Sequence, residues 1–247
     1  MIETGSLCER LDWDSGFFGV SIAKAIPTRV DVETCRAILD WCRVEKIDCL
    51  YFLADDDPEA RQVLENAAFV RVDERVTIEL QPIPPALDPP ADTRRARDSD
   101  IAALREIAGR AHYDSRFYND SRFDRARCDE LYRVWIEKSC RGWADHVVVV
   151  ERGGAAIGYL TVHLRQSESA MIGLVGVDSA YRRQGIGQRL MAGALAWLSN
   201  QPVTRVWSAT QGRNAASQGF FQKAGFRPTG RFIWYHRWFH PSIGGQS

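Results

Sequence analysis

The spacing of apolar residues changes along the chain, and each change predicts a different kind of element. Before residue 80, helical spacing at about 31–46 is followed by the apolar run DCLYFLA, a helix that begins at Asp57-Pro58, and the strand RVTIEL. Aspartate before proline is typical of a helix start, because the carboxylate caps the first amides and proline fits the first turn. This order predicts an α/β unit at the N-terminus.

Beyond residue 93, the strand TRRAR and two helices at about 98–112 and 126–139 precede three runs with the composition of strands. These runs, HVVVVER, GGAAIGYLTVHLR and SAMIGLVGV, are separated by turn residues and predict an antiparallel meander. Helices at 186–198 and 214–223 then alternate with the strands VTRVWSA and RFIWYHRWF. The pattern therefore predicts a second, larger structure of helices and strands.

A proline-rich stretch predicts the boundary between the two parts. QPIPPALDPPADT, residues 81–93, has five prolines in thirteen residues and cannot continue a helix. We therefore expect an N-terminal domain at 1–80, a linker at 81–92 and a second domain at 93–247.

An internal similarity relates the two predicted domains. A shift of 157 residues aligns DPEARQVLENAAFVR, which begins at Asp57, with NAASQGFFQKAGFRP, which begins at Asn214. The N-terminal domain is therefore interpreted as a partial copy of the closing β-α-β arm of the second. Chance similarity between two amphipathic helices is the alternative.

Composition narrows the class of protein. The 247 residues include 32 basic and 32 acidic side chains, and this balance argues against a nucleic-acid or membrane-surface partner. The start MIETGSLCERLDWD does not resemble a secretion signal, and no apolar run approaches the roughly 20 residues that span a bilayer. We expect a cytoplasmic protein. Six cysteines without C-x-x-C pairs predict buried free thiols rather than a metal site.

The stretch YRRQGIGQRL, residues 181–190, carries the clearest chemical signal. It joins a predicted strand to a predicted helix, whose first amides lack partners within the helix. Gly185 and Gly187 flank Ile186 there and allow a ligand to approach the backbone, while the helix dipole favours an anion. Three cations accompany them: Arg182, Arg183 and Arg189. The loop is predicted to bind phosphate groups, although it lacks the third glycine of the dinucleotide fingerprint and the lysine of the P-loop.

Two motifs in the second part resemble those of one enzyme family. R-x-x-G-x-G, from Arg182 to Gly187, is similar to the loop with which the GCN5-related N-acetyltransferase (GNAT) superfamily binds the pyrophosphate of acetyl-CoA. NAASQGFFQKAGF, from Asn214 to Phe226, is similar to the signature that closes the domain. The resemblance covers about 93–239 and implies an α/β fold with a central mixed, mostly antiparallel, splayed sheet flanked by helices. The smaller N-terminal α/β domain would resemble a partial arm of the same fold.

The resemblance implies direct transfer of an acetyl group from acetyl-CoA to an amine. The strand MIGLVGV would separate from its neighbour, so that backbone groups at Val175 and Val177 bind the pantetheine arm and an N–H there polarises the thioester carbonyl. The implied cofactor-binding residues are Val175, Val177, Arg182, Arg183, Gln184, Gly185, Ile186, Gly187, Asn214 and Phe221.

The sequence departs from the family pattern at Phe221. Many relatives have a tyrosine at this position, which protonates the leaving thiolate, and phenylalanine cannot donate a proton. Val177, Tyr235 and His163 are the catalytic candidates, for carbonyl polarisation, proton donation and proton abstraction respectively. Tyr159 and Ser217 are further donor candidates. A protein that binds acyl-CoA without catalysis is the alternative.

Two other segments resemble those members of the superfamily that acetylate nucleotide-linked amino sugars of the dTDP-4-amino-4,6-dideoxyhexose type. They are LDWDSGFFGV, residues 11–20, and AHYDSRFYNDSRFD, residues 111–124. The second segment supplies aromatic faces for a base or sugar and guanidinium groups for phosphates. The candidate substrate-binding residues are Tyr113, Arg116, Phe117, Tyr118 and Arg122.

Other acceptors stay open, including a peptide amine, another small amine and other amino sugars or nucleotides. The basic residues that follow Arg94 favour an anionic acceptor over a basic peptide. In the last strand, Phe232, Trp234, His236 and Trp238 alternate along the chain. This alternation favours a strand covered on both faces, with a homodimer interface as the alternative.

Overall fold

The computed structural model describes residues 6–84, 88–113 and 115–240, and the chain forms two compact units. Unit 1 consists of Met1–Arg75, Ser115–Asp124 and Arg231–Ser247, and unit 2 consists of Val76–Asp114 and Arg125–Gly230. The predicted domain boundaries at 81–92 stay a prediction, because a compact unit need not be an independently folding domain. Residues 85–87 of the proline-rich stretch, like the predicted domain ends at 1–5 and 241–247, lie outside the described residues.

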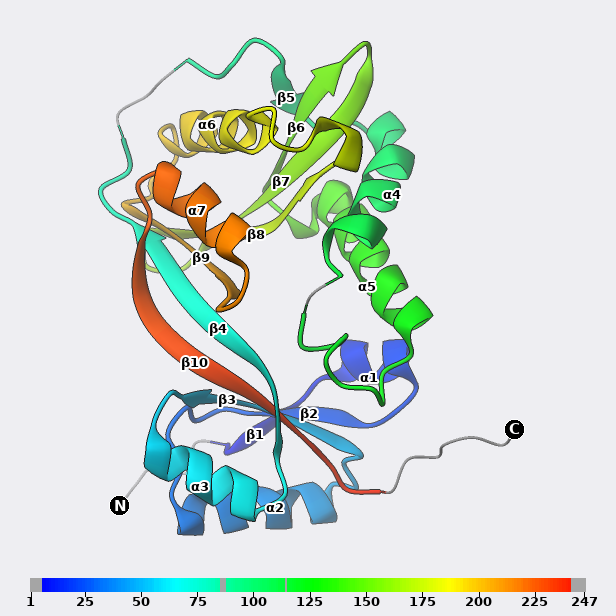
Figure 1. The fold of residues 1–247 in the computed structure, drawn as a ribbon, viewed down its shortest axis with the longest axis vertical. Helices are drawn as coiled ribbons and strands as arrows, with labels where there is room; N and C mark the ends of the chain where they lie inside the picture. Colours follow the sequence, from blue (N-terminus) through cyan, green and yellow to red (C-terminus); the bar gives the residue numbers. More distant parts are fainter. Residues whose placement is uncertain (1–5, 85–87, 114, 241–247) are drawn as a thin grey trace. The chain divides into compact units, whose positions relative to one another are not determined.

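Unit 1 is built on a mixed sheet with helices on both faces. Its elements are β1 (Cys8–Arg10), α1 (Asp12–Phe18), β2 (Ile22–Ala25), α2 (Val32–Val44), β3 (Cys49–Asp55), α3 (Pro58–Asn66) and parts of β4 (Val70–Leu80) and β10 (Arg227–Trp238). The strand order is β1-β2-β3-β10-β4. β2 and β3 are parallel, whereas β3 and β10 are antiparallel, with Tyr51 opposite His236. Figure 1 shows α2 and α3 side by side along the same strands.

Different elements cover the two faces of β3 and β10. Leu50, Phe52 and Tyr235 are at most 1% exposed and pack in one hydrophobic cluster with residues of α2 and α3. Tyr51 and His236 point to the opposite face, because successive residues of a strand alternate. Their rings contact Phe123 of the segment Ser115–Asp124. The prediction that the last strand packs on both faces is confirmed.

Unit 2 contains the larger part of the helices and strands. Its elements are β5 (Thr93–Arg95), α4 (Ile101–Ala111), α5 (Arg125–Lys138), β6 (His146–Arg152), β7 (Ala155–Arg165), β8 (Ser169–Val177), α6 (Ile186–Leu198), β9 (Arg205–Gln211), α7 (Ala215–Lys223), the short helices η1 (Asp98–Asp100), η2 (Ser139–Trp143) and η3 (Ser179–Tyr181), and the remaining parts of β4 and β10.

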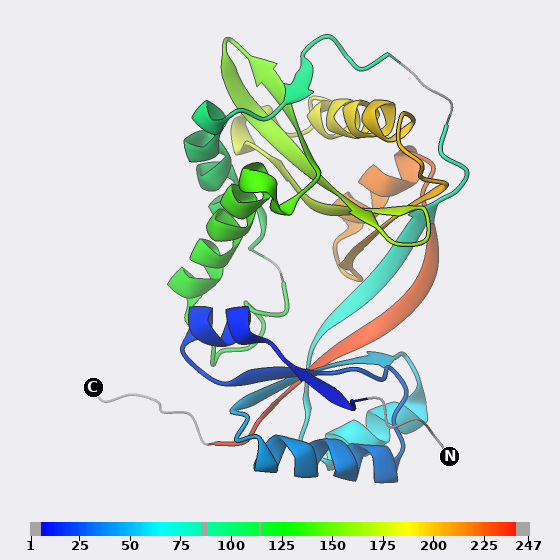
Figure 2. The same ribbon diagram turned by 180° about the vertical axis from the view of Figure 1, so that it is seen from behind.

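The sheet of unit 2 has the order β10-β4-β9-β8-β7-β6-β5. β5 to β8 pair in antiparallel fashion, and β8 pairs with β9 in parallel. α4, with α5 beside it, packs on one face, and α6 and α7 cover the other (Figures 1 and 2). Leu160, Ile172 and Leu190 are at most 1% exposed and belong to the core between α6 and the sheet. The predicted fold class, a mixed and mostly antiparallel sheet flanked by helices, is confirmed.

Two differences from the predicted elements have simple reasons. β1, α1 and β2 lie before residue 31, where no element was predicted, because three to seven residues are too few to show a periodic pattern. β4 begins at Val70 rather than at residue 75. The polar residues Arg71, Asp73 and Glu74 interrupt the apolar alternation in its first half.

The internal similarity extends to the structure of the two arms. α3 and α7 each have nine residues. Asp57 and Asn214 cap them in the same way, because each side chain accepts a hydrogen bond from the amide three residues later. β4 and β10 then begin at Val70 and Arg227. Agreement in length, cap and spacing supports the interpretation as a partial copy.

None of the helices in the described ranges combines the length and the apolar composition that crossing a bilayer requires. The cysteines are free thiols, and five of them are buried: Cys8, Cys35, Cys42, Cys49 and Cys128. Their predicted burial is therefore confirmed, and Cys140 is half-buried.

Candidate active site

β8 and β9 pair over only part of their lengths. Their parallel ladder ends at Met171 opposite Trp207, although both strands continue beyond these residues. At that point the Ser208 hydroxyl donates to the Ile172 carbonyl over 2.9 Å. The edge of β8 at residues 173–177 is therefore not paired with β9, and the predicted splay of the sheet is confirmed.

A β-bulge lies at the start of this opening. The register between β7 and β8 shifts, so that Thr161 faces two residues, Gly173 and Leu174. The Thr161 hydroxyl accepts a hydrogen bond from the Leu174 N–H over 2.8 Å. Bulges disrupt the ladder and redirect nearby backbone groups. This bulge directly precedes Val175 and Val177, whose backbone is the predicted contact of the pantetheine arm.

His163 lies on β7 beside the bulge. Its side chain is 2% exposed, and its Nε2 is 2.9 Å from the position that a Cβ on Gly173 would take, so the ring packs on the backbone of β8. Burial lowers the pKa of His163. The ring is therefore neutral at neutral pH and able to accept a proton. Its role as a base stays a prediction.

The turn between β8 and α6 depends on a left-handed glycine. Gly185 has φ of +77°, a conformation that costs other residues about 1–2 kcal/mol. No side chain of the described residues caps α6, and a Cβ on Gly185 would meet no atom within 4 Å. The first amides of α6 are consequently accessible to an anionic ligand.

Other residues of the loop are held by the protein itself. Ile186 is 3% exposed and anchors the start of α6 in the core. A Cβ on Gly187 would lie 3.2 Å from the Phe220 ring, so this glycine allows α6 and α7 to pack closely. Arg182 Nε donates to the Val177 carbonyl over 3.3 Å. The loop is thus tied to the end of β8.

The remaining polar residues of the loop differ in their partners. Arg189 Nε donates to Asp92 Oδ1 over 2.9 Å, so its charge is neutralised within the protein, unlike the cation expected beside a ligand. Gln184 Nε2 donates to the Ala180 carbonyl. Arg183 is exposed and has no hydrogen bond or ion pair within the described part of the chain. Arg182 and Arg183 therefore remain the candidate cations.

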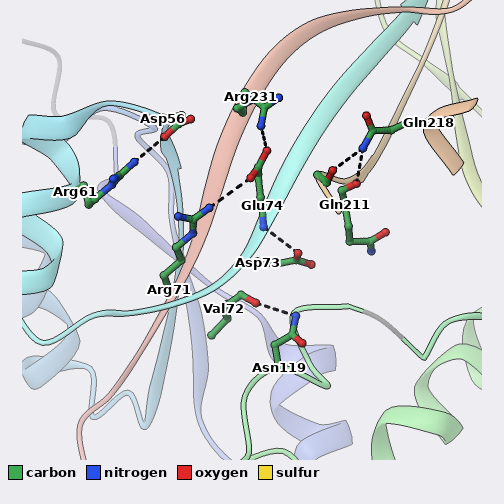
Figure 3. Close-up of polar contacts among 11 residues, drawn as sticks. Asp56, Arg61, Arg71, Val72, Asp73, Glu74, Asn119, Gln211, Gln218 and Arg231 are labelled. Carbon is green, nitrogen blue, oxygen red and sulfur yellow. Dashed lines mark hydrogen bonds and ion pairs between the residues drawn. The ribbon is translucent and has the colours of Figure 1, made fainter. Parts of the chain in front are cut away.

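The start of α7 fixes the end of β9. Asn214 Oδ1 accepts a hydrogen bond from the Ser217 amide over 2.9 Å. Gln218 Nε2 donates to the carbonyls of Gln211 and Gly212 over 3.2 and 2.7 Å (Figure 3). The Gln218 side chain of α7 therefore ties the end of β9, on the far side of the opening, to the helix.

Phe221 contributes an apolar wall rather than a proton donor. It is 3% exposed, and its ring centroid lies 5.2 Å from that of Phe226 in the core. At the position of the family's tyrosine, this chain therefore has a phenylalanine that packs in the core.

Tyr159 of β7, on the side of β8 away from β9, has a hydroxyl group. A Cβ on Gly176 would lie 2.6 Å from the Tyr159 ring, which therefore packs directly on the backbone of β8. The Tyr159 hydroxyl is 2.9 Å from His112 Nε2. Burial raises the pKa of Tyr159 and lowers that of His112 to about 4, so both groups are neutral at neutral pH. The sequence pattern did not single out His112, because a histidine at a helix end gives no signal until its distant partner is known.

The other predicted proton donors have different surroundings. Tyr235 belongs to unit 1, where it is 1% exposed in the cluster with α2 and α3. Ser217 lies in the first turn of α7 and is half-buried. Tyr159 is consequently the one of the three whose ring lies against the unpaired segment of β8.

The predicted acceptor-binding residues fall into both units. Tyr113 belongs to unit 2 and is 64% exposed. Arg116, Phe117, Tyr118 and Arg122 belong to unit 1. Phe117 is buried, Tyr118 is half-buried, and Arg122 Nη1 donates to a backbone carbonyl, that of His240, over 3.0 Å.

A cavity of about 250 Å³ opens at the end of β8 in unit 2. Glu106 and Arg110 of α4 line one side, and Val177, Asp178 and Arg182 line the other. Two predicted cofactor contacts, Val177 and Arg182, therefore border one hollow.

Comparison with known proteins agrees with this geometry. The sequence matches the profile of the Acetyltransferase (GNAT) family over residues 101–226. It is 28% identical over 232 residues to a protein of Escherichia coli O6:H1 named dTDP-fucosamine acetyltransferase, and the alignment covers 93% of this chain and 97% of that protein. It is 24% identical over 139 residues to the spore coat polysaccharide biosynthesis protein SpsD of Bacillus subtilis, with 56% of this chain and 48% of that protein covered.

The fold is similar to that of a GCN5-related N-acetyltransferase from Sphaerobacter thermophilus. The TM-score is 0.64 at 15% sequence identity, and the alignment covers 96% of this chain and 77% of that one. At this identity the likeness concerns the fold.

Proposed function

The chain belongs to the acetyltransferase (GNAT) family and is an N-acetyltransferase, and from this premise we propose that it transfers the acetyl group of acetyl-CoA to the amine of a nucleotide-linked amino sugar. The proposed acceptor is of the dTDP-4-amino-4,6-dideoxyhexose type. The observation that carries the proposed chemistry is the opening between β8 and β9, which leads to the left-handed turn at Gly185.

The residues around this opening fit acetyl-CoA, which supplies an activated acetyl thioester. The first amides of α6 beside Gly185 suit the pyrophosphate, and Arg182 and Arg183 suit its charge. The unpaired edge of β8 at Val175 and Val177 suits the amides of the pantetheine arm, because each needs a hydrogen-bond partner. Gln184, Ile186 and Gly187 complete the proposed loop, with Asn214 and Phe221 on the side of α7.

The proposed reaction is attack of the acceptor amine on the thioester carbonyl. The N–C bond forms and the C–S bond breaks, while His163 accepts a proton from the amine and Tyr159 gives a proton to the departing thiolate. A backbone N–H at Val177 stabilises the carbonyl oxygen as it gains charge, and one such donor is worth about 3–4 kcal/mol. Tyr159 takes the place of the family's tyrosine in this scheme, because its ring packs on β8 and its hydroxyl stays protonated.

The acceptor class is supported by similarity along the chain and by the chemistry of the segment Ser115–Asp124. The relative named dTDP-fucosamine acetyltransferase aligns with 93% of this chain. Arg116 and its aromatic neighbours supply a cation and flat apolar surfaces, which suit a nucleotide sugar.

Release of free thiol from acetyl-CoA tests the proposal. The acceptor panel contains dTDP- and UDP-linked amino sugars, with a basic peptide as the competing class and dTDP without an amine as the blank. We expect turnover with a dTDP-linked 4-amino sugar and none with the peptide. Turnover on the peptide alone would contradict the proposed acceptor, and CoA binding without turnover on any amine would contradict the proposed catalysis.

A further inference from the structure

In the described part of unit 1, three arginines have a buried nitrogen without a hydrogen-bond partner, and two of these arginines, Arg75 and Arg116, lie close enough to influence each other electrostatically. Arg75 lies on β4 and Arg116 lies in the segment Ser115–Asp124. Arg75 Nε and Arg116 Nη1 are buried without a hydrogen-bond partner. Within the described ranges neither side chain forms an ion pair. The pKa of Arg75 is lowered chiefly by burial and also by the positive charge of Arg116 nearby. Two neighbouring cations without an acidic partner are unfavourable unless an anion binds them.

The protein holds these arginines in place. The Arg116 guanidinium carbon lies 4.3, 4.4 and 4.2 Å from the ring centroids of Tyr51, Phe117 and Trp234. Asn119 Nδ2 donates to the Val72 carbonyl over 2.9 Å, which fixes the segment that carries Arg116 to the strand that carries Arg75 (Figure 3). A guanidinium group that is already oriented loses less freedom when it binds a ligand.

Other polar atoms around Arg116 are also unused. Within the described residues, the Tyr51 hydroxyl and His236 Nε2 have no hydrogen-bond partner, both residues are 0% exposed, and their ring centroids lie 4.6 Å apart. The Asp120 carboxylate accepts a hydrogen bond from His236 Nδ1 over 2.8 Å, so Nε2 of the neutral ring is an acceptor. The cluster therefore combines two cations with the buried Tyr51 hydroxyl, the buried ring acceptor of His236 and the Asp120 carboxylate that holds this ring.

We propose that Arg75 and Arg116 bind the diphosphate of a nucleoside diphosphate, with Tyr51 and His236 beside it. A diphosphate carries more than one negative charge and many acceptor oxygens, and guanidinium groups match phosphate geometry with paired N–H donors. Both arginine residues are partly exposed although these two nitrogens are buried, so a ligand is able to reach part of each side chain. The inference rests on the proposed function and assigns the phosphates of the acceptor to this cluster.

Calorimetric titration of the full chain tests the site without any variant. The ligands are dTDP, UDP, thymidine, inorganic pyrophosphate and CoA. We expect dTDP to bind about tenfold or more tightly than thymidine, and pyrophosphate to compete with it, because the arginines contact phosphate. The proposal would be overturned if dTDP and thymidine bound with equal affinity and UDP bound no more tightly than thymidine. Competition between CoA and dTDP would show that the two ligands share one phosphate site and would also overturn it.

Three variants test the residues. Arg75→Gln and Arg116→Gln should each weaken dTDP about tenfold or more and leave thymidine and CoA unaffected. Arg29→Gln is the matched control, because Arg29 is an arginine of the same unit whose side chain is 92% exposed and pairs with Asp55 over 3.2 Å. In steady-state kinetics the KM for the nucleotide-linked amino sugar should rise by a similar factor in the first two variants, with kcat within about twofold.

The outcomes separate this inference from the proposed function. Turnover on a nucleotide sugar with an unchanged KM in both arginine variants would overturn the inference and leave the function. If dTDP bound in an arginine-dependent way but no nucleotide sugar were turned over, the diphosphate site would be supported and the proposed acceptor would be contradicted. An equal loss of dTDP affinity in Arg29→Gln would show an effect of overall charge and overturn the inference.

Discussion

Gly185 affects both the backbone conformation and the space for a ligand, and a matched pair of substitutions separates the two. Gly185→Val places a side chain beside the first amides of α6, so we expect the KM for acetyl-CoA to rise about tenfold or more. Gly154→Val is the control, because Gly154 has φ of +81° against +77° for Gly185, and an added Cβ meets no atom within 4 Å at either position. An equal KM for acetyl-CoA in the two variants would contradict the phosphate-binding role.

Tyr159 and Tyr235 are competing candidates for the proton donor, and one substitution at each decides between them. Tyr159→Phe keeps the ring that packs on Gly176 and removes the hydroxyl, so we expect kcat to fall about 100-fold, as is typical for loss of a general acid. The KM for acetyl-CoA should change little. A loss of kcat in Tyr235→Phe, with Tyr159→Phe unchanged, would assign the role to Tyr235 instead.

At the residue scale, the sequence predicts the local structure of the candidate site where its signal is local, and the roles of these residues stay predictions. The loop from Arg182 to Gly187 and the cap at Asn214 follow from short motifs whose spacing fixes their place at helix starts. His112 and Arg75 were missed for the opposite reason. The partner of His112 lies 47 residues away in the sequence. Arg75 became a candidate only because Arg116, from another segment, lies near it in the structure.

At the scale of elements, Ser208 marks the end of the β8–β9 ladder, and its removal tests how the opening is stabilised. Ser208 is 1% exposed and donates to the Ile172 carbonyl. Ser208→Ala leaves that buried carbonyl without this donor, which should lower the free energy of unfolding by about 1–3 kcal/mol. Urea denaturation monitored by circular dichroism measures the change.

Ser199→Ala is the control for this substitution. Ser199 also donates to a backbone carbonyl, that of Ala196, over 2.9 Å, but it is half-buried at the end of α6 and water is able to replace its hydroxyl. We expect a change within about 0.5 kcal/mol. Equal changes in the two variants would show that the Ser208 bond has no special role at the opening.

Periodicity predicts long elements and fails for short or irregular ones. α2, α6 and α7 are long enough for an apolar face to repeat, whereas β1 and β2 are not. The splay of β8 follows from the family resemblance and not from the apolar pattern, because MIGLVGV has the composition of any buried strand. Its structural basis, the bulge opposite Thr161, depends on register with β7, which a single segment does not encode.

At the scale of the whole molecule, the order of segments in the sequence does not determine the composition of the compact units. Ser115–Asp124 belongs to unit 1 although both neighbouring helices belong to unit 2. The aromatic residues of this segment pack on the face of β3 and β10 that α2 and α3 leave free. Such packing depends on two distant surfaces matching, and apolar spacing along the chain carries no information about it.

The pH dependence of overall stability follows from histidines that are held neutral in both units. Burial lowers the pKa of His112, His146 and His236 to about 4, whereas histidine in an unfolded chain titrates near 6.5. Between these values the unfolded state binds protons that the folded state does not bind. Stability should therefore fall as the pH decreases from about 6.5 to about 4. Above pH 6.5 these groups should not change the stability as the pH varies. The stabilising effect of Asp100, whose pKa is lowered from 3.8 chiefly by its hydrogen bond to Arg94, is lost only at lower pH.

His146→Phe isolates one of these contributions. The His146 ring stacks on Trp197, with centroids 4.6 Å apart and an interplanar angle of 2°, and its Nδ1 has no hydrogen-bond partner among the residues that the structure describes. Phenylalanine keeps the stacked ring and removes the titrating group. Urea midpoints measured at pH 7, 6, 5 and 4 should fall in both proteins as the remaining histidines take up protons in the unfolded state. They should fall less in the variant, with the difference growing between about pH 6.5 and 4. Parallel curves would show that His146 binds its proton equally well in the folded and the unfolded chain.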